Sequence, residues 1–495
     1  MKTRQAAAPA VRTAPAEAAT PRRASAPSAD GSEIDFGSLD LSLVKEATQK
    51  AAKKRGINAL DNLAELNQLI SKQLKTTIPH HGTSTLYRLG LSMMAAFMLM
   101  MPLAYALLVA GAGYGVYVYA FDVFPGLMSY LPRGRAAIFM LIIYATPIVC
   151  GCISVVFMVK PLFVSMILPA DPRRRSIMRK SEPVLFHLVD EICNAAGSPK
   201  PTRIDVDCRV NASASFGSGL KSLFGNDLVL TIGIPLVSGL SSRQFAGVLA
   251  HEFGHFAQGA GMRASYVVRS INSWFARVVY QRDQIDEWLD DAITESESAF
   301  AIVLLLARFC VWLSRGILWC FMIVAHIGSS FMMRQMEFDA DRMEAGLAGS
   351  DSFAATAERL RTLGFAQQKT HAGLAMLAQQ EAVLLDNIPG TIVEVTKTLS
   401  HKEREVLAES RRDEKTGLFD SHPCDTERID AARELEQPGL FTIDVPARNL
   451  FRNFAALCCN VTQDFYRNQL GRMVEPTELK PFAQHVGKIS AMQPS

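Results

Sequence analysis

The stretch His251-Glu252-Phe253-Gly254-His255 places three side chains together that can perform metal chemistry. On a helix, histidines four positions apart lie on one face, so both imidazoles can bind the same metal ion. Glu252 then lies beside them and can take a proton from a water on the metal rather than bind the metal itself. The spacing predicts a hydrolytic zinc site, although a motif of this length also arises by chance.

The residues around this motif predict the helix that must carry it. Ser241 is suited to be the N-cap residue, and Gln244, three positions later, completes a capping box. Apolar residues recur at a spacing that suits a buried helix, at Phe245, Val248, Leu249, Phe253 and Phe256.

A third ligand is available on a second helical pattern that starts at Arg334. Glu337 would complete a site of two histidines and one glutamate, leaving the fourth position open for water as a catalytic zinc requires. Asp341, one turn further on, can accept the spare N–H of a ligand histidine and fix its tautomer. The alternative is that both carboxylates belong to a solvated acidic helix face.

Taken together, these residues resemble a known family, the integral-membrane zinc metalloproteases that include the heat-shock protease HtpX and the CAAX prenyl protease. The resemblance covers residues 181–436. Four motifs occur in the order of the family: Asn211-Ala212, the His251–His255 helix, the Glu337–Asp341 helix, and His422-Pro423 with Arg428. The resemblance implies an α+β fold, namely a mostly helical gluzincin-type metalloprotease domain with a small sheet, attached to transmembrane helices.

The resemblance also implies roles that spacing alone does not assign. His422 could hydrogen-bond the developing oxyanion, and Arg428 could brace the carboxylates near the metal. In relatives, an edge strand near the Asn-Ala element lines the cleft, so an extended peptide could add to it beside Asn211. Here Asn211-Ala-Ser-Ala departs from the usual Asn-Ala-Phe-Ala. A turn held by Asn211 and a merely structural His422 remain the alternatives.

Composition excludes some classes of partner. The chain has 495 residues and a net charge of only +3, so nothing argues for a nucleic acid partner. Its nine cysteines include no C-x-x-C zinc signature, and reduced thiols facing a cytosol are expected.

Two uncharged apolar stretches, at about 89–121 and 136–159, each exceed the roughly 20 residues that a bilayer core requires. Basic residues cluster before the first stretch and after the second, whereas the loop between them offers only Arg133 and Arg135. By the positive-inside rule, both outer flanks are cytoplasmic. The sequence therefore predicts a multi-pass protein of a bacterial-type inner membrane whose catalytic domain faces the cytoplasm.

Two further segments between the histidines and Glu337 must together cross the membrane an even number of times or not at all. Residues 262–282 form an amphipathic pattern with four arginines, and the apolar stretch 301–333 contains Arg308 and Arg315. Because His255 and Glu337 must bind one ion, the chain between them must leave and return on the same side of the membrane. Either both segments cross as a pair or neither crosses completely, and the arginines favour the second arrangement.

The sequence predicts these segments: a disordered Ala/Pro-rich tail at 1–35, a cytoplasmic helical segment at 36–87, two transmembrane helices within 88–168, a zinc metalloprotease domain at 181–436 with a membrane-associated helical insertion at about 262–333, and a C-terminal helical extension at 437–495.

The prediction for function is a zinc endopeptidase with one Zn²⁺ per chain. The resemblance implies protein or peptide substrates, membrane proteins among them, and a role at the lipid bilayer in membrane protein quality control or processing. A non-cleaving metal-binding scaffold or regulator and a prenyl-protein-type endopeptidase remain alternatives. A transport or channel protein with a chance motif should show paired charges or broken helices within its spans, and the first two stretches show neither.

Overall fold

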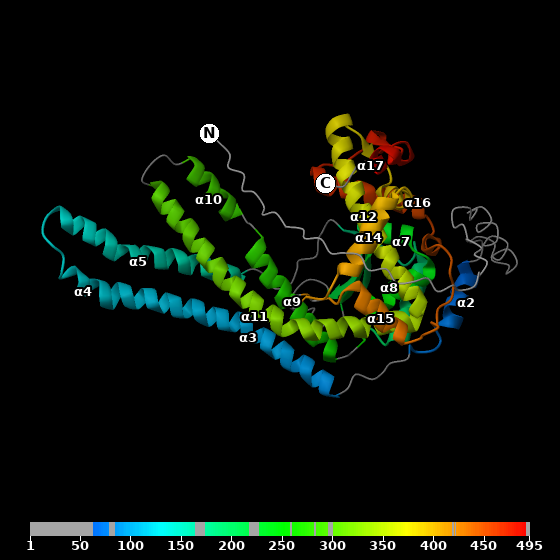
Figure 1. Cartoon of the computed structure of the whole chain (residues 1–495), viewed down its shortest axis with the longest axis horizontal. Coiled ribbons are helices and arrows are strands. Elements are labelled where there is room, and N and C mark those ends of the chain that lie inside the picture. Colours follow the sequence, from blue (N-terminus) through cyan, green and yellow to red (C-terminus); the bar gives the residue numbers. More distant parts are fainter. Residues whose placement is uncertain are drawn as a thin grey trace, which may run out of the picture. The chain divides into compact units, whose positions relative to one another are not determined.

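The computed structural model describes residues 63–78, 85–163, 174–216, 227–257, 260–281, 284–295, 300–417, 420 and 422–491. These residues form a mostly helical fold with one four-stranded and one two-stranded sheet, which confirms the predicted α+β class (Figure 1). The predicted tail at 1–35, and most of the predicted segment at 36–87, lie outside the described residues.

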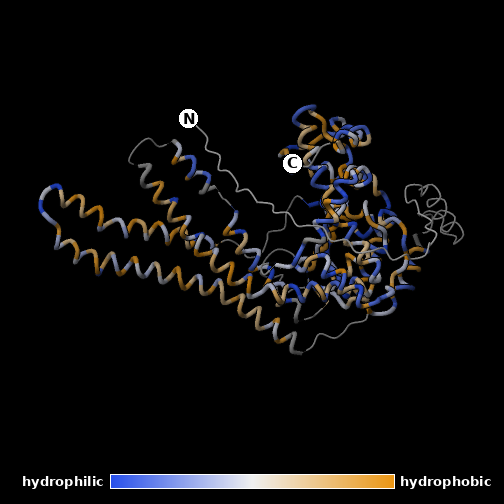
Figure 2. The backbone as a smooth tube through the Cα atoms, viewed as in Figure 1, coloured by the Kyte–Doolittle hydropathy of each residue, from blue (hydrophilic) through white to orange (hydrophobic). Residues whose placement is uncertain are grey.

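Two long apolar helices, α3 (Thr85–Val118) and α5 (Arg135–Val159), begin the described membrane region. A π-helical turn (Tyr119–Val123) joins α3 to α4 (Phe124–Met128), and a 3-10 turn (Lys160–Phe163) follows α5. Figure 2 shows both helices as mainly hydrophobic along their length. By length and composition, Leu89–Met128 and Arg135–Phe163 can each cross a membrane.

A third helix long and apolar enough to span is α11 (Phe300–Ala348), within which the candidate span is Leu304–Ala348. The sequence predicted an apolar helix at 301–333 and a separate helical pattern from Arg334, but the structure joins them into one helix of 49 residues. No proline or glycine occurs at 329–344 to interrupt it. Glu337 therefore lies on the same helix as the apolar segment.

Helix α9 (Ala260–Tyr280) packs on both α3 and α11. Its apolar face is buried in a cluster shared with those helices, through Val268, Ile271, Trp274 and Phe275. The acidic helix α10 (Gln284–Glu295) follows. Its Asp290 lies 2.9 Å from Arg308 of α11, so one of the two arginines in the apolar stretch has a carboxylate partner.

The main sheet is mixed and has the order β1-β2-β4-β3. Its strands are β1 (Arg175–Ile177), β2 (Arg203–Asp207), β3 (Ala212–Phe216) and β4 (Leu228–Gly233). β2 and β4 are parallel, whereas β1 and β3 pair antiparallel with their neighbours. The strand that starts just after Asn211, β3, is at the edge of the sheet.

One apolar core joins this sheet to the surrounding helices. The helices are α2 (Leu63–Gln73), α6 (Pro183–Ala196), α7 (Ile234–Gly239), α8 (Ser242–Gly254), α12 (Ser350–Glu381), α13 (Ile388–Lys397), α14 (His401–Asp413), α16 (Phe454–Leu470) and α17 (Val486–Ala491). α15 (Asp425–Glu434) buries Ile429 and Ala432 in a smaller separate cluster with Phe353 of α12. α2 packs on α6, buries Ile70 and bonds through Ser71 to His187 at 2.8 Å.

The C-terminal residues share the same core. Leu457 and Val461 of α16 are buried in it, and β6 (Leu479–Lys480) pairs with β5 (Leu384–Leu385). Asp464 of α16 also accepts two bonds from Arg175 of β1, at 2.6 and 3.2 Å. The described part of the 437–495 extension is therefore packed on the body of the protein.

Candidate metal centre

Helix α8 positions the histidine motif, and its start follows the local sequence. The Ser241 hydroxyl accepts the Gln244 N–H at 3.3 Å, and the Gln244 side chain accepts the Ser241 N–H at 3.1 Å, which is the predicted capping box. Phe245 and Phe253 are fully buried on the opposite side. The helix therefore has a fixed rotation, and its polar face is turned toward α11.

Two glycines let α8 and α11 approach closely. A Cβ at Gly254, inside the histidine motif, would lie 3.2 Å from the Ala340 Cα, and one at Gly247 would lie 2.9 Å from the Ala348 Cβ. Both distances are tighter than ordinary contacts, so a larger residue would push the two helices apart. Gly254 thus helps to set the distance between the histidines and Glu337.

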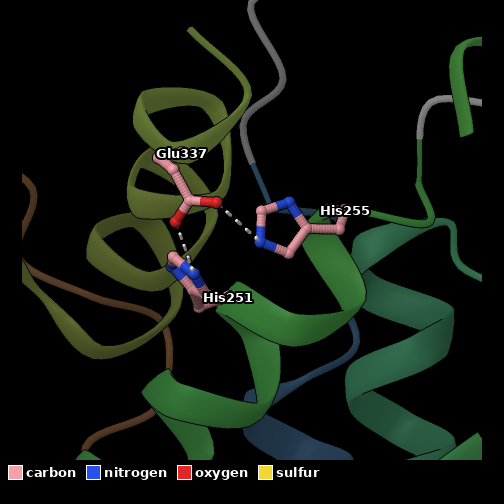
Figure 3. A group of neighbouring side chains, drawn as sticks. All are labelled: His251, His255 and Glu337. Atoms are coloured by element: carbon pink, nitrogen blue, oxygen red, sulfur yellow. Dashed lines mark ion pairs between the residues drawn. The ribbon is translucent and has the colours of Figure 1, made fainter. Parts of the chain in front are cut away.

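Three side chains from these helices converge on one point (Figure 3). The Nε2 atom of His251 lies 3.6 Å from Oε2 of Glu337, and the Nε2 atom of His255 lies 3.7 Å from Oε1 of the same carboxylate. The structure thus brings together the three residues that the sequence predicted as ligands.

The chemistry and spacing of these donors fit a zinc ion. Zinc binds imidazole nitrogen and carboxylate oxygen at about 2 Å in a tetrahedral arrangement, which places ligand atoms about 3 to 4 Å apart. The separations of 3.6 and 3.7 Å agree with that requirement. Because all three donors are buried or nearly so, an ion among them would be shielded from bulk water on most sides.

Asp341 lies behind His251, on the side away from Glu337. Its Oδ1 is 3.0 Å from the Nδ1 of His251, and Arg428 of α15 donates to both of its oxygens at 2.9 and 2.6 Å. Burial alone would lower the pKa of His251, but the carboxylates of Asp341 and Glu337 raise it to about 10. The surroundings of His251 therefore stabilise a positive charge, which a metal ion can supply.

Glu252 points to the edge strand. Its Oε2 accepts the backbone N–H of Ala214 at 3.2 Å, and burial raises the pKa of the carboxyl. Ala214 was not predicted from the sequence, because a backbone N–H can be donated by almost any residue type. Asn211 itself is exposed, and its backbone oxygen accepts the Gly233 N–H at 2.7 Å. Its assigned role in substrate binding stays a prediction.

His422 reaches the centre from the segment before α15. Its Nδ1 lies 3.1 Å from Oε2 of Glu337, while the ring remains 59% exposed. The exposure leaves it able to turn toward a bound substrate. Its neighbour Pro423 is buried and anchors the backbone at this point.

Two further groups at the centre were not assigned from the sequence. Arg269 of α9 donates to Oε1 of Glu337 at 2.9 Å, and Oε2 of Glu344 lies 3.9 Å from the Nδ1 of His251. Burial, and secondly the charge of Arg269, hold the pKa of His255 well below its usual range. Glu344 lies two helical turns after Glu337, so helical spacing could have found it. No spacing rule points to Arg269.

The arrangement predicts a graded effect for Asp341→Asn. An amide would bond more weakly to His251 and would not balance the charge of Arg428. We therefore expect zinc affinity to fall about 10- to 100-fold without being abolished. Competition with a chelator of known affinity measures the change. Asp339→Asn, which removes a contact to Arg342 on the same helix, is the matched control. Complete loss of zinc from the Asp341 variant would make Asp341 a ligand.

The helices, the small mixed sheet and these side chains are those of a metal-dependent peptidase. The sequence model described as Peptidase family M48 matches residues 180–436, which is more than half of the chain, and the protein belongs to this family. The resemblance inferred from the four motifs is thus confirmed.

Curated relatives of the chain include proteins named "Protease HtpX". The one from Ectopseudomonas mendocina is 28% identical over 185 residues, covering 37% of this chain and 58% of the relative. The one from Pseudomonas aeruginosa is 29% identical over 196 residues, covering 39% and 60%. The one from Hahella chejuensis is 28% identical over 180 residues, covering 36% and 56%. The chain thus spans less than two thirds of these relatives, and no solved structure matches it significantly.

Proposed function

We propose that this protein is a membrane-anchored endopeptidase that uses one zinc ion held by His251, His255 and Glu337. The convergence of two imidazoles and one carboxylate from α8 and α11 carries the proposal. Membership of a peptidase family and three helices able to cross a membrane support it further. Zinc, when bound, acts as a Lewis acid that makes water a nucleophile near neutral pH.

Glu252 is the proposed general base. It takes a proton from the attacking water and passes that proton to the leaving amine. The raised pKa of its carboxyl strengthens it as a base near neutral pH. His422, 3.1 Å from Glu337 and exposed on its other side, donates a hydrogen bond to the oxyanion as it develops. Arg428 acts through Asp341, whose orientation it fixes.

Edge strand β3 supplies the proposed substrate site. Because the Ala214 N–H is directed at Glu252, it faces away from β4 and lies on the free edge of the strand. An extended peptide that pairs with this edge would pass directly beside the base. Binding through backbone groups suits internal peptide bonds of many sequences, which favours an endopeptidase.

Membrane proteins are the proposed substrate class, in quality control or processing. Phe331 and Ile327, within ten residues of Glu337 on α11, are 61% and 40% exposed. An apolar surface so near the centre suits lipid or an apolar polypeptide. The alternative of a non-cleaving scaffold is tested by incubating the detergent-purified protein with an unfolded membrane protein. Cleavage by the parent protein but not by Glu252→Gln would support the proposal.

The proposed topology places the catalytic domain at the cytoplasmic face of an inner membrane, with α9, α10 and α11 entering the bilayer without crossing it. Cys310 of α11 donates to the Cys150 oxygen of α5 at 3.7 Å. Cys150 lies nine residues before the end of α5 at Val159, which corresponds to about 14 Å along the helix. Asp290 of α10 pairs with Arg308, two residues before Cys310, so α10 contacts α11 near this level of α5.

Cysteine labelling tests this topology. In a background without native cysteines, Trp288→Cys on α10 should not react with a membrane-impermeant reagent applied to the outer face, because α10 does not cross the bilayer in this topology. Ser129→Cys, in the loop between α4 and α5, should react from the outer face and serves as the control. Both positions carry exposed side chains. Reaction of both cysteines from the same outer face would mean that α9 and α11 cross as a pair.

A further inference from the structure

Arg269 contacts two of the three proposed ligands at once. Its Nη2 atom lies 2.9 Å from Oε1 of Glu337 and 3.1 Å from Nε2 of His255. It also lies 3.2 Å from Nδ1 of His255, and the Nε2 and Oε1 atoms that it contacts face each other across the proposed metal site. The guanidinium therefore lies among the proposed ligands and contacts them directly.

This contact and a bound metal ion exclude each other. The His255 Nε2 and Glu337 Oε1 atoms are 3.7 Å apart, so an ion about 2 Å from both would lie within about 3 Å of the Arg269 Nη2 atom. A guanidinium remains positively charged and has no lone pair to offer a metal. Two cations at that separation repel strongly, so the arginine must leave when the ion enters.

The side chain, rather than the helix, is free to move. Val268, Ile271 and Phe275 fix α9 against α3 and α11, so the backbone at position 269 is held in place. The Arg269 side chain is 36% exposed, and its buried Nε has no hydrogen-bond partner among the described residues. The inward position therefore leaves one N–H of the guanidinium without a hydrogen bond. If the side chain rotates outward, this N–H can donate to water.

We propose that Arg269 is a built-in competitor for the metal, an inference that rests on the metal site of the proposed function. The guanidinium neutralises Glu337 and holds the ligands together before the ion is loaded. Loading displaces it toward solvent. The protein thereby resists acquiring metal until zinc is available at a sufficient concentration, because each ion that binds must break this contact.

The affinity of the full-length, detergent-purified protein for zinc tests the proposal. The Glu252→Gln background removes the proposed general base and leaves all three ligands intact. In it, Arg269→Gln and Arg269→Met should bind zinc about 10- to 100-fold more tightly, the range of one charge-assisted hydrogen bond. Arg263→Gln removes an exposed arginine from the same helix and should leave the affinity unchanged. Two different replacements guard against one that fails to fold.

A second readout does not depend on affinity. Without metal, the Arg269 variants should melt at a lower temperature than the parent, and zinc should raise their melting temperature by more. Equal or weaker zinc binding by both Arg269 variants would overturn the inference alone, since Arg269 would then be neutral toward the metal or support it. Absence of zinc binding from every protein, parent included, would overturn the metal assignment and this inference with it.

Discussion

Replacing Glu252 by glutamine should abolish measurable proteolysis while zinc remains bound. The amide oxygen can still accept the Ala214 N–H, and the ligands His251 and His255 are unchanged, so the site should keep its geometry. The amide cannot take a proton from water, and loss of a general base typically costs about 100- to 10,000-fold in rate. Cleavage of an unfolded membrane protein, followed on gels together with the zinc content, measures both effects.

The control for this change is a glutamate remote from the centre. Glu405 on α14 is 61% exposed, and Glu405→Gln should cleave at the parental rate. If Glu252→Gln cleaved at that rate as well, another group would have to be the base. If it lost zinc together with activity, the effect would be structural and the assignment of the base would lack support.

The ligand helix was predictable because its determinants are local. The capping residues Ser241 and Gln244, the apolar stripe and the two histidines all lie within sixteen residues, and each acts through helix geometry alone. The distance between the histidines and Glu337 was not predictable in the same way. It depends on Gly254 and Ala340, which let the two helices approach. The presence of a small residue in a motif does not indicate which other helix will pack against it.

Other features depend on packing between distant segments. Arg269 enters the ligand cluster because α9 is held against α3 and α11, and the sequence indicated only an amphipathic helix with four arginines. From the sequence, burying the charge of Arg308 in an apolar stretch was expected to be unfavourable. Its partner Asp290 lies eighteen residues earlier, on another helix. Pairings of this kind follow from the fold, whereas helical spacing reports only which residues share one face of the same helix.

The second large effect is expected for Glu337→Ala, which should remove zinc. Glu337 is the only one of the three proposed ligands that carries a negative charge, and both of its oxygens face a histidine ligand. Its loss should weaken zinc binding by more than the roughly 10- to 100-fold that outer partners such as Asp341 contribute. Elemental analysis after dialysis against metal-free buffer measures the remaining zinc.

The comparison with Asp341→Asn separates a ligand from a supporting residue. Loss of Glu337 also leaves Arg269 and His422 without their shared carboxylate, so circular dichroism must first show that the variant is folded. Glu337→Gln, which keeps the size of the side chain, is the second variant for this purpose. Retention of zinc at parental affinity by both Glu337 variants would mean that another residue is the third ligand. Glu344, 3.9 Å from His251, would then be the first candidate to test by mutation.

A folded Glu337→Ala protein without zinc, beside an Asp341→Asn protein that still binds it, would establish that α11 completes the metal site through Glu337.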